Sequence, residues 1–363
     1  MNRVGIWITF FSLLLCAGCS HPGGADGFKI AFVPSKPGEH GVVSINSDTT
    51  GLKILVADPM AQVRFASWSP DGKRLAFYNL RSQDQDILKK YRMINEYLLY
   101  VMDATGANQK RLLDFPVIDF GWAPDSRRLF FISAYESPER NSPELLNGTR
   151  NPLAFVYVLD MQTGGTTRLP GSGRNCSASW SPDGTRLAVG FGDGENCGIY
   201  LISPDGGRSE RLTDGSTIDF RPAWSPDGKT IAYVAYPKTD ADANNSGVFV
   251  IAADGTGKRR VDQETVSYVM WSMDGSRLLL QAANTARLVD RYGQKRVLLS
   301  AGTGLHRIVN AILTPNGKGV MFCSDDSGVW NIYSAGLEGQ HRRTITSRTS
   351  SSNFCLSPLL ARR

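Results

Sequence analysis

Trp-Ser-Pro-Asp-Gly occurs three times in this chain, at Trp68–Gly72, Trp180–Gly184 and Trp224–Gly228. Three altered copies follow the same plan: WAPDS at Trp122–Ser126, WSMDG at Trp271–Gly275 and LTPNG at Leu313–Gly317. The copies lie about 42 to 58 residues apart, a spacing typical of repeat proteins with one supersecondary unit per repeat. We therefore expect the repeated residues to build the scaffold and any activity to lie in the residues that do not repeat.

One copy shows what each repeat builds. Ser225–Gly228 has proline second, aspartate third and glycine last, which is the composition of a tight turn. A first strand leads into the turn at Ala223-Trp224, and a second, Thr230–Val234, follows it. A third strand at Val248–Ile251 and a fourth around Lys258–Val261 are separated by an Asp-Gly turn. Each repeat is thus predicted to be a blade of four short antiparallel strands. The tryptophans are predicted to pack between repeats.

The two ends of the chain supply a seventh blade. Lys29–Val33, Val42–Ile45 and Leu52–Val56 are three strands with no first strand before them, and Asn353–Pro358 is a first strand with none after it. Pairing the N- and C-terminal strands closes the ring and removes an exposed sheet edge. The prediction is an all-β fold, a seven-bladed β-propeller with about 47 residues per blade.

The repeat resembles that of TolB-type propellers, most clearly at Trp68–Phe77, Trp180–Leu187 and Trp224–Tyr233. The resemblance implies the fold. It leaves function open, because similar repeats also build the propellers of prolyl-oligopeptidase-like peptidases and oligogalacturonate lyases. For TolB itself it implies contact with a peptidoglycan-associated lipoprotein and with colicins. We expect two differences from TolB, namely seven blades instead of six and no separate N-terminal domain.

The first residues resemble a bacterial lipoprotein signal. Met1–Gly18 contains one cation and an apolar run, Val4–Leu15, that is too short to span a bilayer. Cys19 directly follows Ala17-Gly18, as the lipidated cysteine of a lipobox does; the alternative is an ordinary signal peptide cleaved nearby. The predicted organisation is a signal peptide at 1–18, a tether at 19–27, the propeller at 28–358 and a tail at 359–363. The predicted location is the outer membrane, facing the periplasm or the cell surface.

The chain is basic, with a formal charge of +6 and a pI near 9.0. Its clusters Lys258–Arg260 and Arg342–Arg343 fall on predicted outer strands, where charge protects a sheet edge. No nucleic-acid recognition motif is present, so we expect no nucleic-acid partner. Attraction to anionic lipid head groups is compatible with this charge.

Four cysteines follow Cys19 in the sequence. Cys176 and Cys197 precede the first and third strands of one predicted blade, so a disulfide between them is expected on one face. For Cys323 and Cys355 the sequence leaves two possibilities open, a bridge that clamps the ring closure or buried free thiols.

Two adjacent blades carry long insertions between their second and third strands, Asn79–Tyr97 and Ser133–Ala154, each with the pattern of a short helix. Functional groups on scaffolds concentrate in such loops. A partner surface is therefore predicted here, with candidate polar contacts at Lys89, Lys90, Arg92, Glu136, Glu139 and Arg140. The alternative is a solvated insertion without a partner.

The motifs of common hydrolases and metalloenzymes do not occur. The loop Asp240–Gly247 resembles a calcium loop but lacks its glycine and glutamate at the required positions, so neither a metal nor another cofactor is expected. We predict a monomeric binding or assembly module for envelope proteins, with no catalytic residue. The alternative is a polysaccharide lyase or hydrolase at the axial end of the ring, to which His40 and His306 could contribute.

Overall fold

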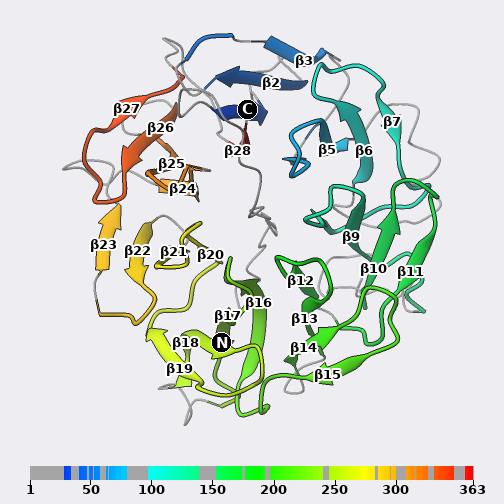
Figure 1. Ribbon diagram of the computed structural model, residues 1–363, viewed down its shortest axis with the longest axis vertical. Helices are drawn as coiled ribbons and strands as arrows, with labels where there is room; N and C mark the ends of the chain where they lie inside the picture. Colours follow the sequence, from blue (N-terminus) through cyan, green and yellow to red (C-terminus); the bar gives the residue numbers. More distant parts are fainter. Residues whose placement is uncertain are drawn as a thin grey trace, which may run out of the picture.

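The computed structural model describes residues 28–33, 41–46, 49–51, 53–57, 63, 65–79, 97–138, 153–173, 176–192, 197–239, 245–282, 285–294, 296–299, 308–314, 316–325, 331–346 and 356–362. These residues form seven four-stranded antiparallel sheets, arranged as the blades of a ring (Figure 1). The described residues include no α-helix. The fold is the predicted seven-bladed β-propeller. The helices expected in the two insertions lie outside the described residues.

Blades 1 to 4 contain the following strands, from the axis outward. Blade 1 is β28 (Leu356–Arg362), β1 (Phe28–Val33), β2 (Gly41–Asn46) and β3 (Lys53–Ala57). Blade 2 is β4 (Ala66–Trp68), β5 (Arg74–Asn79), β6 (Leu98–Asp103) and β7 (Lys110–Arg111). Blade 3 is β8 (Asp119–Trp122), β9 (Arg128–Ser133), β10 (Phe155–Asp160) and β11 (Thr166–Arg168). Blade 4 is β12 (Ser177–Trp180), β13 (Leu187–Phe191), β14 (Gly198–Ile202) and β15 (Ser209–Arg211).

Blades 5 to 7 follow the same plan. Blade 5 is β16 (Ile218–Trp224), β17 (Thr230–Tyr236), β18 (Gly247–Ala252) and β19 (Arg259–Asp262). Blade 6 is β20 (Tyr268–Trp271), β21 (Arg277–Gln281), β22 (Ala286–Asp290) and β23 (Arg296–Leu299). Blade 7 is β24 (Ile308–Leu313), β25 (Gly319–Ser324), β26 (Asn331–Gly336) and β27 (Arg343–Thr344).

Blade 1 joins the two ends of the chain, as predicted. β28 is its innermost strand and pairs with β1 from Phe28↔Arg362 to Val33↔Leu356 (Figure 1). The strand therefore runs to Arg362, and most of the tail predicted at 359–363 belongs to it. Pro358 does not end the strand because it lies in a bulge, where its missing N–H costs no ladder hydrogen bond.

The repeated pentapeptide forms the turn between the first and second strands. In blade 2 the Gly72 N–H donates to the Ser69 carbonyl at 2.8 Å, and the Ser69 hydroxyl donates to Asp71 Oδ1 at 2.6 Å. Gly72 has a φ of +68°, which glycine adopts without steric cost. Ser126 takes the glycine position of the altered WAPDS copy at a φ of +58°, and its Oγ accepts a hydrogen bond from the Asp71 N–H at 3.0 Å. The aspartate of the pentapeptide is thus explained by its hydrogen bond within the turn.

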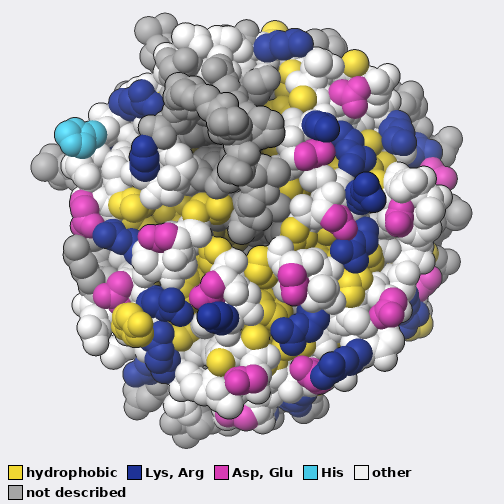
Figure 2. Space-filling view, in the orientation of Figure 1, with side chains coloured by type: hydrophobic (Ala, Val, Ile, Leu, Met, Phe, Trp, Pro, Cys, Tyr) yellow, Lys and Arg dark blue, Asp and Glu magenta, His cyan; other side chains and the backbone are white. Residues whose placement is uncertain are grey.

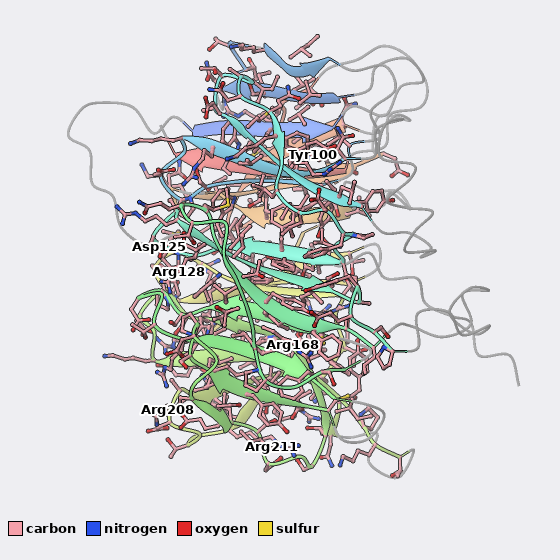
Figure 3. All side chains as sticks on the ribbon, turned by 90° about the vertical axis from the view of Figure 1, so that its right-hand side faces the viewer. Tyr100, Asp125, Arg128, Arg168, Arg208 and Arg211 are labelled. Carbon is pink, nitrogen blue, oxygen red and sulfur yellow. The ribbon has the colours of Figure 1, made fainter. Side chains whose placement is uncertain are left out.

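These turns share one face of the ring with the turns between third and fourth strands. We call it the turn face; Asp125, Arg128 and Arg208 mark it in Figure 3, and Figure 2 shows it with hydrophobic side chains around its centre. The second strands end on the opposite face, which we call the connection face.

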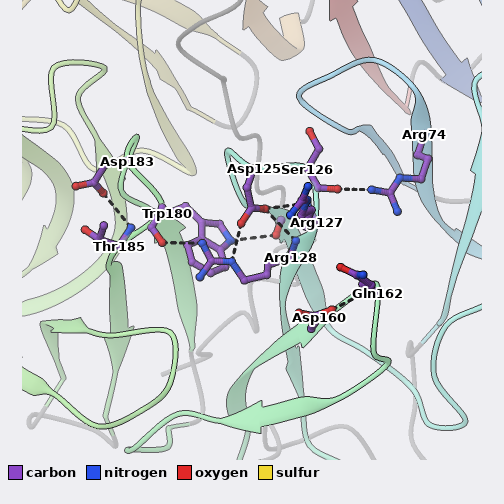
Figure 4. Close-up of polar contacts among 12 residues, drawn as sticks. Arg74, Asp125, Ser126, Arg127, Arg128, Asp160, Gln162, Trp180, Asp183 and Thr185 are labelled. Carbon is purple, nitrogen blue, oxygen red and sulfur yellow. Dashed lines mark hydrogen bonds and ion pairs between the residues drawn. The ribbon is translucent and has the colours of Figure 1, made fainter.

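Neighbouring blades are joined on the turn face by an arginine that lies over the next tryptophan (Figure 4). The guanidinium carbons lie 5.0 to 5.3 Å from the ring centroids in three pairs: Arg74 over Trp122, Arg128 over Trp180 and Arg186 over Trp224. The indole N–H groups of Trp122 and Trp180 donate to backbone carbonyls of the preceding blade at 3.0 and 3.3 Å. We call each such pair an inter-blade clasp. It confirms the predicted packing role of these tryptophans.

Cations in or next to the outer strands lie over aromatic rings. Arg168 lies 4.0 Å from the ring of Phe155, and Arg342 lies 4.0 Å from that of Tyr333. Lys258 Nζ lies 5.6 Å from the ring of Phe249. Aromatic pairs stack between second and third strands in several blades, at Phe77–Tyr100, Phe131–Tyr157, Tyr233–Phe249 and Phe322–Tyr333. The basic clusters predicted on outer strands therefore pack against the blades as well as charging their edges.

Candidate functional site

The connection face holds the described part of the predicted partner surface. Of its six predicted residues, only Glu136 is described; Lys89, Lys90, Arg92, Glu139 and Arg140 lie outside the described residues. Glu136 follows β9 just after the strand ends at Ser133. The contacts of Glu136 are therefore known, whereas the roles of the other five residues stay predictions.

Three side chains hold the Glu136 carboxylate. The hydroxyl groups of Tyr135 and Tyr157 each donate to it at 2.8 Å, and Arg168 Nη1 donates to Oε2 at 3.2 Å. The ring of Tyr135 stacks on Phe115, with centroids 3.8 Å apart and planes 14° apart. We call these five residues, Phe115, Tyr135, Glu136, Tyr157 and Arg168, the Glu136 cluster.

The cluster has fixed charges. Burial alone would raise the pKa of Glu136, but the two phenols and Arg168 outweigh it and lower that pKa. Burial raises the pKa of Tyr157, and the adjacent carboxylate raises it further, so the phenol stays a hydrogen-bond donor. The Glu136 and Arg168 side chains remain 37% and 52% exposed. The surface thus offers an oriented carboxylate and guanidinium beside stacked aromatic rings.

Most of this cluster was not predicted from the sequence. Tyr157 and Arg168 lie directly opposite each other in the β10–β11 ladder, and Phe131 lies opposite Tyr157 in the β9–β10 ladder. The aromatic and basic residues at these positions come from separate strands, so they meet only once the register is known. Several repeats have an aromatic residue in the third strand and a cation in the fourth strand. This recurring pair is the sequence pattern that could have predicted Tyr157 and Arg168.

Two polar residues of inner strands have a left-handed backbone. Arg221, in the middle of β16, and Asn310, in β24, adopt left-handed φ values of 55° and 52° at bulges in these strands. Arg221 Nη1 donates to the Val266 carbonyl at 3.2 Å and to the Ser267 carbonyl. Burial lowers the pKa of Arg221, and the Tyr236 hydroxyl group and the Asp119 carboxylate oppose that shift. Strained non-glycine residues often mark functional sites. His40 and His306 lie outside the described residues.

The structure does not contain the predicted Cys176–Cys197 disulfide: both cysteines are buried thiols. Cys176 Sγ lies 3.3 Å from the carbonyl oxygens of Ala154 and Gly173, which can accept its hydrogen. Burial raises the pKa of the Cys176 thiol to about 12. Cys323 is disulfide-bonded. Cys355 lies outside the described residues, so its pairing stays open.

The described part of the chain shows neither a metal-binding cluster nor a membrane-spanning helix. There, no group of three His, Cys, Asp or Glu side chains is placed to hold a metal ion. Residues 240–244 of the calcium-like loop lie outside it, as do residues 1–27 with the apolar run and Cys19. Over the same described ranges, no helix has the length and hydropathy needed to cross a membrane.

Proteins of different kinds share this fold among solved structures. TolB from Acinetobacter baumannii aligns with a TM-score of 0.53 at 16% identity, over 92% of this chain and 66% of its own. An oligogalacturonate lyase from Vibrio parahaemolyticus aligns with a TM-score of 0.57 at 17% identity, over 82% and 83%. At these identities the likeness shows the fold alone.

Sequence relatives match shorter parts of the chain. An uncharacterised protein from Agrobacterium fabrum is 28% identical over 146 residues, which are 40% of this chain and 44% of that protein. A TolB homologue from Chlorobium chlorochromatii is 33% identical over 139 residues, which are 38% of this chain and 28% of the homologue. The chain thus spans less than half the length of either relative. The model of the TolB beta propeller domain matches residues 86–358, well over half of the sequence, and the chain belongs to that family.

Proposed function

We propose that this chain is a protein-binding module of the bacterial cell envelope, anchored to a membrane by a lipid at Cys19. Its binding surface is the connection face of blades 2 and 3. The Glu136 cluster carries the proposal, because it combines an oriented ion pair with stacked aromatic rings, and Glu136 belongs to one of the two long unrepeated stretches of the sequence. Membership of the TolB family supports an envelope role.

The chemistry of the cluster suits protein recognition. Tyrosine and arginine are enriched among the residues that dominate binding energy at interfaces. The Arg168 guanidinium lies over Phe155 and contacts Glu136, so little side-chain freedom is lost when a partner binds. A half-exposed guanidinium fixed in this way can donate to a partner carboxylate or backbone carbonyl.

The experiment is crosslinking and pulldown from envelope membranes with the full chain and with Arg168→Leu and Glu136→Gln variants. Partners bound through the cluster should be recovered about fivefold less with either variant. The matched control is Arg208→Leu, because Arg208 and Glu210 form another exposed ion pair, at 3.0 Å, on the outer strand of blade 4. Equal recovery of the same partners by all four proteins would reject the surface, provided that all unfold at the same temperature.

The anchor is tested separately. Labelling with a fatty-acid analogue should mark the wild-type chain and be lost in Cys19→Ala. A label that persists in this variant would show that Cys19 is not the site of lipidation. The same variant, released from the membrane, should still bind partners through the Glu136 cluster.

A second candidate function is a polysaccharide-active enzyme at the axial end. The observation that favours it is the left-handed backbone of Arg221 in an inner strand. Its guanidinium is partly buried, and the Asp119 carboxylate raises its pKa against the effect of burial. The test is depolymerisation of acidic polysaccharides by the wild-type chain, compared with Arg221→Gln. Activity that depends on Arg221 would favour the enzyme, and activity unaffected by the substitution would exclude this site.

A further inference from the structure

The turn after β22 presents an exposed tyrosine between two arginines. Asp290 Oδ1 accepts hydrogen bonds from the backbone N–H groups of Tyr292 and Gln294, both at 2.9 Å. Gly293 has a φ of +76°, and a Cβ at this position would meet the Val261 carbonyl of β19 at 2.4 Å. The turn is therefore fixed tightly against blade 5. Its tyrosine side chain is 62% exposed.

Two guanidinium groups meet at this ring. The guanidinium carbon of Arg259, in β19, lies 5.0 Å from the Tyr292 ring centroid, and that of Arg291 lies 5.9 Å from it. Arg259 Nη2 also donates to the Arg291 carbonyl. We call Arg259, Arg291 and Tyr292 the Tyr292 site.

The cations of this site lack the carboxylate partners that other outer cations have. Arg168, Arg208 and Lys258 form ion pairs at 3.0 to 3.2 Å. Among the described residues, the ion pairs involve neither Arg259 nor Arg291. Burial lowers the pKa of Arg259, and the charge of Arg291 lowers it further. In the part of the chain that the structure describes, these two like charges thus lie close together with no direct ion pair to either. The carboxylates of Asp290 and Asp227 interact with Arg259 and Arg291, respectively, without forming one.

We infer that the Tyr292 site binds a phosphate monoester. Guanidinium groups match phosphate oxygens with paired hydrogen bonds, and a monoester is largely a dianion at neutral pH, equal in charge to the two arginines. The exposed Tyr292 ring can pack against the organic group that carries the phosphate. The chemistry is shared by a soluble phosphosugar and by a lipid with a phosphate monoester head group. No part of the Glu136 cluster takes part in it.

The test is calorimetric titration of the full chain with glucose 6-phosphate and, separately, with glucose. The phosphosugar should bind with a dissociation constant of about 1 mM or less, and glucose should not bind. Arg259→Gln and Arg291→Gln should each weaken binding at least about fivefold. Arg208→Gln is the control, because it removes an exposed cation on the same face but outside the site.

Two further arms complete the experiment. Arg259→Lys and Arg291→Lys keep the charges but lose the planar fork, so they should also weaken binding, and they guard against misfolding of the glutamine variants. Cosedimentation with vesicles containing phosphatidic acid, compared with phosphatidylcholine alone, separates the lipid source from the soluble one. No saturable binding of either phosphate monoester, or equal weakening by Arg208→Gln, would overturn the proposal.

Discussion

The guanidinium carbon of Arg128 lies 5.0 Å from the ring centroid of Trp180 in the next blade, and Arg128 Nη2 donates to the Gly184 carbonyl at 2.9 Å. The same arginine pairs with Asp125 of its own turn at 2.7 Å (Figure 4). One side chain therefore connects two copies of the repeated turn. The clasp gives the repeat a role between blades as well as within one.

Removing this clasp should destabilise the ring. Arg128→Ala is expected to lower the free energy of unfolding by about 1–3 kcal/mol, since it removes a cation–π contact and a charge-assisted hydrogen bond. Denaturant unfolding followed by tryptophan fluorescence measures the change. Arg208→Ala, which removes an exposed ion pair, should change stability by less than about 1 kcal/mol. Equal effects of the two variants would show that the clasp stabilises the ring no more than an exposed ion pair does.

The buried ion pair between blades 5 and 6 should be more sensitive. Arg287 binds Asp262 through two hydrogen bonds of 2.7 and 3.0 Å, and the Asp262 side chain is fully buried. Arg287→Met would leave that carboxylate without its cation, at an expected cost of about 3–5 kcal/mol. Adding Asp262→Leu should recover part of the loss, which a double-mutant cycle measures. A double variant no more stable than Arg287→Met would contradict this account.

Acid should weaken the contact between Asp214 and Lys258, which are 3.2 Å apart. Burial alone would raise the pKa of Asp214, but hydrogen bonds from Ser216 and Lys258 outweigh it and lower the pKa to about 2. An unfolded aspartate has a pKa near 3.9. The stabilising effect is therefore complete above about pH 4 and is lost as the pH falls towards 2. Asp214→Asn should be less stable than wild type at pH 7, with the difference shrinking towards pH 2. A constant difference would be the contrary result.

The thiols of Cys176 and Cys197 should stay unreactive in the folded chain. Both are buried, and burial raises the pKa of Cys176 to about 12, so very little thiolate is present at pH 8. Alkylation followed by mass spectrometry should modify these two residues only after denaturation. Recovery of a peptide linked through Cys176 and Cys197, without reductant, would instead establish the disulfide predicted from the sequence.

The sequence predicted the scaffold because each repeat carries its own turn chemistry. The pentapeptide places a tight turn after each tryptophan, and the three strands expected before Trp68 correspond to β1, β2 and β3. The extent of the closing strand was predicted less well. A proline near its centre suggests an end, and only the pairing with β1 shows that Pro358 lies in a bulge.

The candidate sites were predicted less completely because they depend on register. Glu136 was identified from its place in an insertion, but Tyr157 and Arg168 join it from two other strands. Likewise, Arg259 and Arg291 belong to different blades and meet only where Gly293 packs against β19. Local sequence indicates turns, whereas contacts between strands and blades require the assembled ring.

The place of β28 in blade 1 has a consequence for biosynthesis. β1, β2 and β3 are made first, but β1 keeps an unpaired inner edge until Leu356–Arg362 have been made and delivered. Ring closure therefore happens late, only after these seven residues of β28 have been synthesised. A chain cut short before Leu356 would retain a bare strand edge, the kind of surface that promotes aggregation and exposes unfinished proteins to quality-control proteases.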